Sequence, residues 1–128
     1  MSVNAPSELK YTKEHEWTKI EGDIVAVGIT DFAQNSLGDI VYVELPEIGS
    51  TLTHGNAFGV VESIKSVSDL YAPISGEVVE VNTKLEKNPE LINGNAYESW
   101  IVKIKINNKG ELNNLLSSAD YIDFCENS

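Results

Sequence analysis

The segment from Val60 to Val81 constrains the fold of this chain more than any other. β-Branched apolar residues lie on both sides of Lys65, which is typical of strands: Val60, Val61 and Ile64 before it, and Val78, Val79 and Val81 after it. Gly55 and Gly76 mark the outer ends of this pattern, and Lys65 is near their midpoint. The pattern predicts a β-hairpin in which the strands run up to and away from Lys65. Such a hairpin holds the lysine amine in water, and that position suits a covalent attachment point.

Other segments predict further strands joined by short helices. Apolar residues alternate in Asp23–Ile29, Asp39–Leu45 and Trp100–Ile106, which is typical of strands. Between the first two, Thr30 or Asp31 begins a predicted short helix that Gly38 ends.

The same alternation predicts which side chains are buried. In the last strand it places Trp100 inward and Ile101 outward, and in the second it places Val41 on one face with Val43 and Leu45. Trp17 and Ile20 are predicted core residues. Gly28 indicates a bulge or a close backbone approach.

The C-terminal tail from Glu111 has an apolar stripe at helical spacing. Ser117 or Ser118 is a suitable N-cap for a short helix there. The stripe is typical of core packing rather than of a partner site. Its members are Leu112, Leu115, Leu116, Ala119 and Ile122.

The length of 128 residues fits one domain spanning 1–128, in which residues 1–9 are predicted to be flexible. No apolar run approaches the roughly 18–20 residues of a membrane span. The N-terminus has neither a signal-peptide nor a transit-peptide pattern. We therefore expect a cytoplasmic protein, or the mature form of an organellar one, with no membrane association.

The net charge of −11 argues against nucleic-acid binding, which requires clustered basic residues to neutralise phosphates. An acidic surface favours solubility and can steer the chain toward basic partner proteins. The single cysteine, Cys125, excludes an intramolecular disulfide and a cysteine-based zinc site. It is expected to be a packed thiol.

The sequence contains no recognisable catalytic or metal-binding set. The triplet Glu14-His15-Glu16 resembles a metal site, but alternate residues of a strand share a face, so His15 is expected to point away from both glutamates. His54 has no partner at ligand spacing. No glycine-rich phosphate loop precedes a helix. We expect no metal and no catalysis by the chain itself.

The surroundings of Lys65 fit modification by another enzyme. Glu62 lies three residues before the lysine and Asp69 four after it, which gives a modifying enzyme an acidic recognition frame. Acylation would remove the charge of the lysine and lengthen its side chain. Small residues keep the tip accessible, namely Ser63, Ser66 and Ser68.

Five blocks of the chain resemble the H proteins of the glycine cleavage system. The resemblance extends from Tyr11 to about Phe124, and the blocks occur in family order. Ser99 departs from the pattern, because the family usually has glycine there, and this affects one local turn. The blocks are Tyr11–Trp17, Gly28–Gln34, Leu37–Pro46, Val61–Asn82 and Asn88–Leu91.

The resemblance implies a mainly β fold, a barrel-sandwich hybrid of two small antiparallel sheets with short helices and a C-terminal helical segment. It also implies lipoate, amide-linked to Lys65 by a lipoate ligase or a lipoyl/octanoyl transferase. Glu62, as part of the acidic frame, is the residue that we expect this enzyme to recognise. The lipoyl arm would visit a PLP-dependent glycine decarboxylase, a tetrahydrofolate-dependent aminomethyltransferase and dihydrolipoyl dehydrogenase. The chain itself would be a non-catalytic carrier of the aminomethyl group.

The family also folds its loaded arm into a surface cleft. The matching residues are Glu16 and Asp69, whose carboxylates would pair with the ammonium of the arm, and Ile29 as an apolar wall. The residues alone favour two surface acids and a core isoleucine, and the family resemblance reverses that interpretation.

Three alternatives remain open. The first is another swinging-arm module, a lipoyl domain of a 2-oxoacid dehydrogenase or a biotinyl carrier, but the Ile64-Lys65-Ser66 tip fits neither. The second is an H-like protein that donates its lipoate to other carriers. The third is an enzyme in its own right, which no residue set supports.

Overall fold

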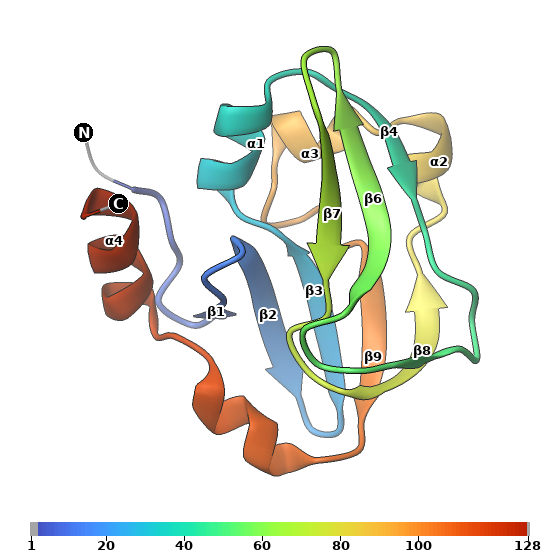
Figure 1. Cartoon of the computed structure of the whole chain (residues 1–128), viewed down its shortest axis with the longest axis vertical. Helices are drawn as coiled ribbons and strands as arrows, with labels where there is room; N and C mark the ends of the chain where they lie inside the picture. The colour runs from blue at the N-terminus through green and yellow to red at the C-terminus, as the bar shows by residue number, and fades with distance from the viewer. Residues whose placement is uncertain (1–2, 128) are drawn as a thin grey trace.

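Two antiparallel sheets enclose a shared apolar core in the computed structural model, which describes residues 3–127 (Figure 1). The larger sheet has the strand order β1-β2-β3-β9-β8-β5, and the smaller has the order β4-β6-β7. The predicted mainly β fold of two small antiparallel sheets with short helices is therefore confirmed. The strands are β1 Lys10–Tyr11, β2 Glu16–Glu21, β3 Ile24–Ile29, β4 Ile40–Glu44, β5 Thr51–Leu52, β6 Ala57–Ser63, β7 Val67–Tyr71, β8 Gly76–Val81 and β9 Val102–Ile106.

Short helices connect and flank the sheets. The predicted helix is confirmed as α1, in which the Thr30 hydroxyl accepts the N–H of Ala33 and the Gly38 N–H donates to Gln34. The tail forms two elements instead of one helix, a 3₁₀ helix and α4, and Leu115 and Leu116 of the apolar stripe lie between them. Ser117 caps α4 by accepting the N–H of Asp120. The helices are α1 Asp31–Leu37, α2 Lys84–Lys87, α3 Leu91–Gly94, the 3₁₀ helix Lys109–Asn114 and α4 Ser118–Glu126.

The lysine hairpin is confirmed, but its second strand was wrongly placed. The strand that pairs with β6 is β7, whereas the apolar run of Val78, Val79 and Val81 lies in β8 of the larger sheet. Pro73 and Gly76 separate the two strands. The strand pattern of β7 is weak because Ser68 and Asp69 interrupt its apolar residues.

Three burial predictions are wrong for a local reason each. Val41 is 53% exposed because a register shift between Ile40 and Tyr42 interrupts the alternation of β4. Ile101 is fully buried because it precedes β9 and its N–H donates to Val27. Ile20 is 37% exposed next to the turn that joins β2 to β3.

A second apolar cluster joins α4 to the larger sheet. Trp17 is buried as predicted, and its ring lies directly over Gly28, where an added Cβ would come within 2.6 Å of it. Tyr121 of α4 stacks on Tyr11 with ring centroids 4.7 Å apart, and Cys125 is buried beside them, as predicted. The C-terminal helix is therefore part of the packed structure.

Residues 3–9 contact this second cluster along α4. The carbonyl of Pro6 accepts the Tyr11 hydroxyl at 2.6 Å, and that of Ala5 accepts the Ser118 hydroxyl at 2.6 Å. Leu9 is buried. The predicted flexible segment 1–9 includes Met1 and Ser2, which lie outside the described residues.

Candidate functional site

Lys65 lies exposed at the tip of the β6–β7 hairpin, as predicted. The Ser63 hydroxyl oxygen accepts the backbone N–H groups of Lys65 (3.3 Å) and Ser66 (3.1 Å). The N–H of Ile64 donates to the carbonyl of Asp39 at 3.2 Å, which ties the tip to the start of β4. The backbone that carries the lysine is therefore hydrogen-bonded on both sides of the turn.

We expect Ser63→Ala to loosen this tip. The substitution removes the shared acceptor of the two turn N–H groups, and a lost hydrogen bond of this kind costs about 1 kcal/mol of unfolding free energy. Hydrogen exchange should accelerate at the amides of Lys65 and Ser66. The matched control is Ser50→Ala in the loop after β4, which should leave both amides unchanged; unaltered exchange in Ser63→Ala would contradict the role of the hydroxyl.

The Lys65 side chain extends toward the end of α1. A Cβ added to Gly38 would lie 3.4 Å from Cε of Lys65 and 3.9 Å from Nζ. Gly38 has φ +83°, a conformation that glycine adopts without strain. The amine therefore lies next to the last turn of α1, where Leu37 lines an adjacent cleft.

The cleft brings together all three residues predicted for the arm. It has a volume of about 210 Å³, and its lining includes Glu16 from β2, Ile29 from the end of β3 and Asp69 from β7. Helix α1 contributes one wall through Phe32, Ala33, Ser36 and Leu37. Carboxylates set among apolar side chains suit a cationic group on an apolar stem.

Glu16 is the most perturbed acid of the cleft. Only 2% of its surface is exposed. Its carboxylate accepts the Thr12 hydroxyl at 2.6 Å and the backbone N–H of Tyr71 at 3.2 Å. Burial nevertheless outweighs these two hydrogen bonds and raises the pKa of Glu16 to about 7. The group can therefore change charge near neutral pH.

The sequence did not identify Glu14 and His15 as cleft residues, although both line it. The expectation that His15 points away from both glutamates assumed that it lies in a strand, and that premise is wrong. His15 precedes β2 and has φ +68°, the only positive φ of a non-glycine residue within 3–127. A turn of this kind leaves no periodic signal; the only trace was the triplet Glu14-His15-Glu16 itself.

Several contacts hold His15 in this conformation. Its carbonyl accepts the N–H of Thr30 at 3.0 Å, and its Nδ1 lies 2.8 Å from the Tyr121 hydroxyl of α4. Its ring stacks on Phe32. Burial lowers the pKa of His15, against a smaller opposing effect of Glu14. Helix α4 thus supports the cleft wall from behind.

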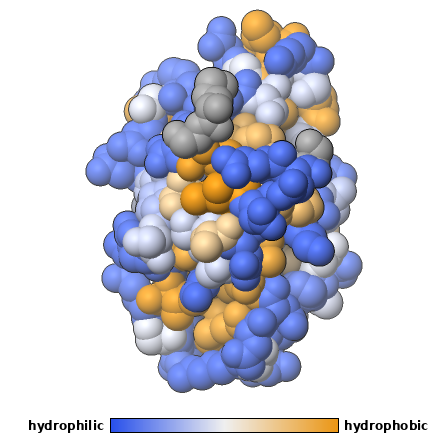
Figure 2. Space-filling view, turned by 90° about the vertical axis from the view of Figure 1, so that its left-hand side faces the viewer, coloured by the Kyte–Doolittle hydropathy of each residue, from blue (hydrophilic) through white to orange (hydrophobic). Residues whose placement is uncertain are grey.

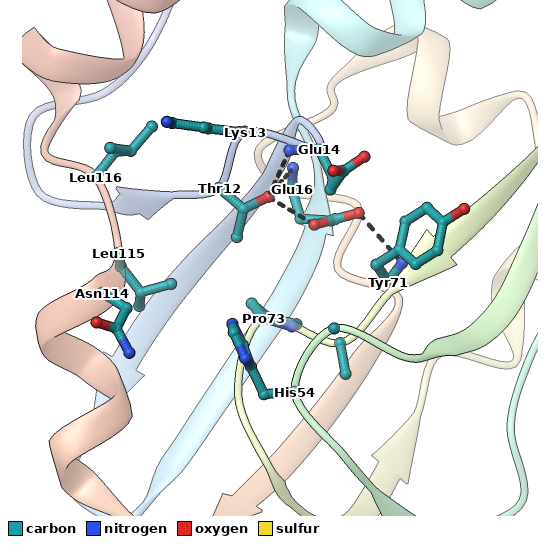
Figure 3. A pocket seen from close by; sticks show the side chains of 12 residues that line it. Thr12, Lys13, Glu14, Glu16, His54, Tyr71, Pro73, Asn114, Leu115 and Leu116 are labelled. Atoms are coloured by element: carbon teal, nitrogen blue, oxygen red, sulfur yellow. Dashed lines mark hydrogen bonds between the residues drawn. The ribbon is translucent and has the colours of Figure 1, made fainter.

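A second cavity of about 520 Å³ adjoins the cleft (Figure 3). Glu14 and Glu16 line both cavities. In Figure 3 the Glu16 carboxylate lies between Thr12 and the backbone of Tyr71, and His54 is seen below them, beside Pro73. The buried carboxylate of Glu16 therefore forms part of the boundary between the two cavities.

Glu62 lies away from the cleft. It is in β6, between Tyr42 of β4 and Val67 of β7 in the cross-strand register. Of the residues predicted to accompany Lys65, Glu16, Ile29 and Asp69 therefore line the cleft, whereas Glu62 lies in the strand that leads to the hairpin tip. Within residues 3–127, no three His, Cys, Asp or Glu side chains are grouped so as to hold a metal ion. None of the helices there is long and apolar enough to cross a membrane.

Comparisons with known proteins agree on one family. The model of the glycine cleavage H-protein family matches residues 9–128. A glycine cleavage system H protein of Symbiobacterium thermophilum is 61% identical over 123 residues, 95% of this chain and 96% of that protein. One from Staphylococcus epidermidis is 58% identical over 117 residues, 91% of this chain and 93% of that protein.

A solved structure supports the same grouping. The crystal structure of a glycine cleavage system H protein from Mycobacterium marinum superposes with a TM-score of 0.85 at 39% identity. The match covers 95% of this chain and 99% of that one. The predicted barrel-sandwich fold of two antiparallel sheets is thereby confirmed.

Proposed function

Because the chain belongs to the glycine cleavage H-protein family, we propose that it is a lipoyl-lysine carrier that takes lipoate on Lys65. The observation that supports this most directly is the position of Lys65, exposed on a hydrogen-bonded hairpin tip and adjacent to a cleft that contains Glu16 and Asp69. The proposed role is that of a non-catalytic carrier in the cytoplasm.

The residues around Lys65 fit amide formation. The neutral amine attacks the carbonyl carbon of an activated lipoyl donor, an acyl-adenylate or a thioester, and the nucleotide or thiol leaves as the amine loses its proton. The donor and the base belong to the attaching enzyme, a lipoate ligase or a lipoyl/octanoyl transferase. The chain contributes an unhindered amine. Glu62, near the end of β6 and three residues before Lys65, contributes a negative charge.

In the proposed cycle three enzymes act on the carried group. The PLP-dependent glycine decarboxylase supplies the aminomethyl group, the aminomethyltransferase passes its one-carbon unit to tetrahydrofolate, and dihydrolipoyl dehydrogenase restores the oxidised carrier. The attached lipoyl group supplies the sulfur atoms on which this group travels. A tether keeps the carried group at high effective concentration near each docked enzyme.

The proposed task of the cleft is to hold the loaded arm away from water. The aminomethyl group carries an ammonium, with which the carboxylates of Glu16 and Asp69 pair. Ile29 and the α1 side chains exclude water from the apolar stem. Glu14, which lines the same cleft, adds a third negative charge near the ammonium.

Intact-mass analysis tests the proposal in two stages. Incubation with lipoate ligase, lipoate and ATP should add one lipoyl group to the chain. Subsequent incubation with glycine and the decarboxylase should add one aminomethyl group to the lipoylated form alone, and unmodified protein is the control. A chain that accepts no lipoyl group would refute the carrier role; one that passes its lipoyl group to other carriers but accepts no aminomethyl group would indicate the lipoate relay instead.

A further inference from the structure

The outer face of the smaller sheet has an unusual composition next to Lys65. Antiparallel partners share a face, so the register Tyr42–Glu62–Val67 forms one row across β4, β6 and β7. Tyr42 is 45% exposed and Val67 66% exposed. Ile64 at the tip is 73% exposed. Large apolar side chains therefore surround Glu62, the acid nearest to Lys65 in the sequence.

A second row across the same three strands also alternates acidic and apolar residues, but with the apolar residue in the middle. Glu44, Val60 and Asp69 are cross-strand partners, so the valine lies between two acids where the first row has an acid between two apolar residues. The two rows together form a checkered face of apolar and acidic side chains. Figure 2 shows hydrophobic atoms at the top of the molecule, where Figure 1 places the hairpin tip.

The charge of this face has one sign. The strands β4, β6 and β7 contain acidic residues but no lysine or arginine. Lys65 at the tip is the nearest cation along the hairpin. A complementary surface would therefore present basic side chains around apolar ones, with a recess for one lysine.

The length of the lysine side chain indicates which partner needs this face. A bare lysine places its amine only about 6 Å from the backbone. An enzyme that bonds to that amine must therefore contact the tip. Because a specific interface covers about 800 Å² on each partner, its contact surface extends beyond the tip, and the adjoining sheet face is exposed to it. Enzymes that act on the far end of a lipoyl arm reach their target at a greater distance and do not need this contact.

We propose that this checkered face is the docking surface for the enzyme that attaches the lipoyl group to Lys65. The inference rests on the proposed lipoyl-carrier function and adds the surface that the attaching enzyme contacts on the unmodified chain. The partner is a lipoate ligase with a basic and apolar surface around its acceptor channel. Apolar contacts with Tyr42 and Val67 supply affinity, and Glu44 and Glu62 supply orientation and faster association.

The first test removes the apolar side chains. The double variant Tyr42→Thr/Val67→Thr keeps β-branched residues in both strands and removes the large apolar groups. In steady-state lipoylation with purified ligase, lipoate and ATP, the KM for the carrier should rise about tenfold while kcat stays within about twofold. The matched control, Ile48→Thr/Val79→Thr, removes exposed apolar groups elsewhere and should behave as wild type.

The second test removes the charges. Glu44→Gln/Glu62→Gln should raise KM several-fold at low salt and flatten its dependence on ionic strength, because association no longer benefits from attraction. The control Glu47→Gln/Glu77→Gln removes the same number of negative charges but leaves the checkered face intact. It should retain the salt dependence of wild type.

Docking is also measured without modification. Lys65→Arg protein should inhibit lipoylation of wild type competitively, and adding Tyr42→Thr/Val67→Thr to it should abolish the inhibition. Thermal unfolding verifies that each variant is folded.

The outcomes separate this inference from the proposed function. If wild type accepts no lipoyl group, the proposed function fails. If wild type is lipoylated, and the variants of the checkered face have the same KM and the same inhibitory effect as the matched proteins with an intact face, the docking surface is wrong while the carrier role stands. Variants that are lipoylated normally, but loaded more slowly by the decarboxylase once lipoylated, would assign the face to the decarboxylase and overturn the inference.

Discussion

Lys65→Arg is expected to abolish lipoylation completely. The guanidinium stays protonated in proteins and its electron pair is delocalised, so it cannot attack an acyl donor. Arginine keeps the charge and the length of lysine at an exposed tip, so the fold should be unchanged. After prolonged incubation with ligase, lipoate and ATP, intact mass should show only unmodified protein, and glycine with the decarboxylase should add nothing.

Eight other lysines in the chain make this a test of position rather than of chemistry, since all carry the same amine. Lys87 at the end of α2 is exposed and provides the matched control. Lys87→Arg should be lipoylated at the wild-type rate. A lipoyl group found on Lys65→Arg protein would show that the ligase recognises something other than the hairpin tip.

The hairpin tip could be predicted because its signals are local. Lys65 lies between β-branched runs, and the turn is closed by Ser63 within the same few residues. The strand after the turn was misplaced because β7 alternates weakly, and the stronger run in β8 contributes to the other sheet. Periodicity identifies strands but does not determine which of two nearby strands pairs with a third.

The cleft could be predicted only through the family resemblance. Glu16, Ile29 and Asp69 come from three strands of two sheets, and no spacing in the sequence brings them together. His15 was not predicted to line the cleft because it has a left-handed backbone and its ring contacts the hydroxyl of Tyr121, 106 residues away. Contacts of this range arise from packing and leave no local pattern.

Glu16→Gln is expected to stabilise the fold at alkaline pH. The pKa of Glu16 is raised by burial from 4.5 to about 7, so the folded state binds the proton more tightly than the unfolded state does. Its contribution to stability is therefore fully present below pH 4.5 and is lost as the pH rises through 7. A shift of this size corresponds to about 3 kcal/mol of unfolding free energy.

Thermal unfolding across pH measures this effect. Glutamine is close in shape to the protonated acid and keeps an acceptor for the Tyr71 N–H, so variant and wild type should have similar Tm values at pH 4. At pH 8 the variant should unfold several degrees higher. Glu77→Gln, at an exposed acid of β8 outside the cleft, is the control and should show no such pH-dependent gain; a constant difference between Glu16→Gln and wild type at every pH would contradict the buried-charge explanation.

Glu16→Gln should also impair the proposed function. Higher stability together with lower function distinguishes a residue that binds the arm from one that only supports the fold. In the loaded carrier the ammonium of the arm favours the carboxylate form of Glu16, so docking of the arm recovers part of the cost of the buried charge. Glutamine cannot provide that pairing, and the aminomethyl adduct of Glu16→Gln should hydrolyse several-fold faster than that of wild type at pH 8, as followed by intact mass. If the variant were both more stable and equally protective of the adduct, Glu16 would have no part in holding the arm. A variant that is more stable but less protective is the result expected of an acid kept buried, at a cost to stability, for the group that it binds.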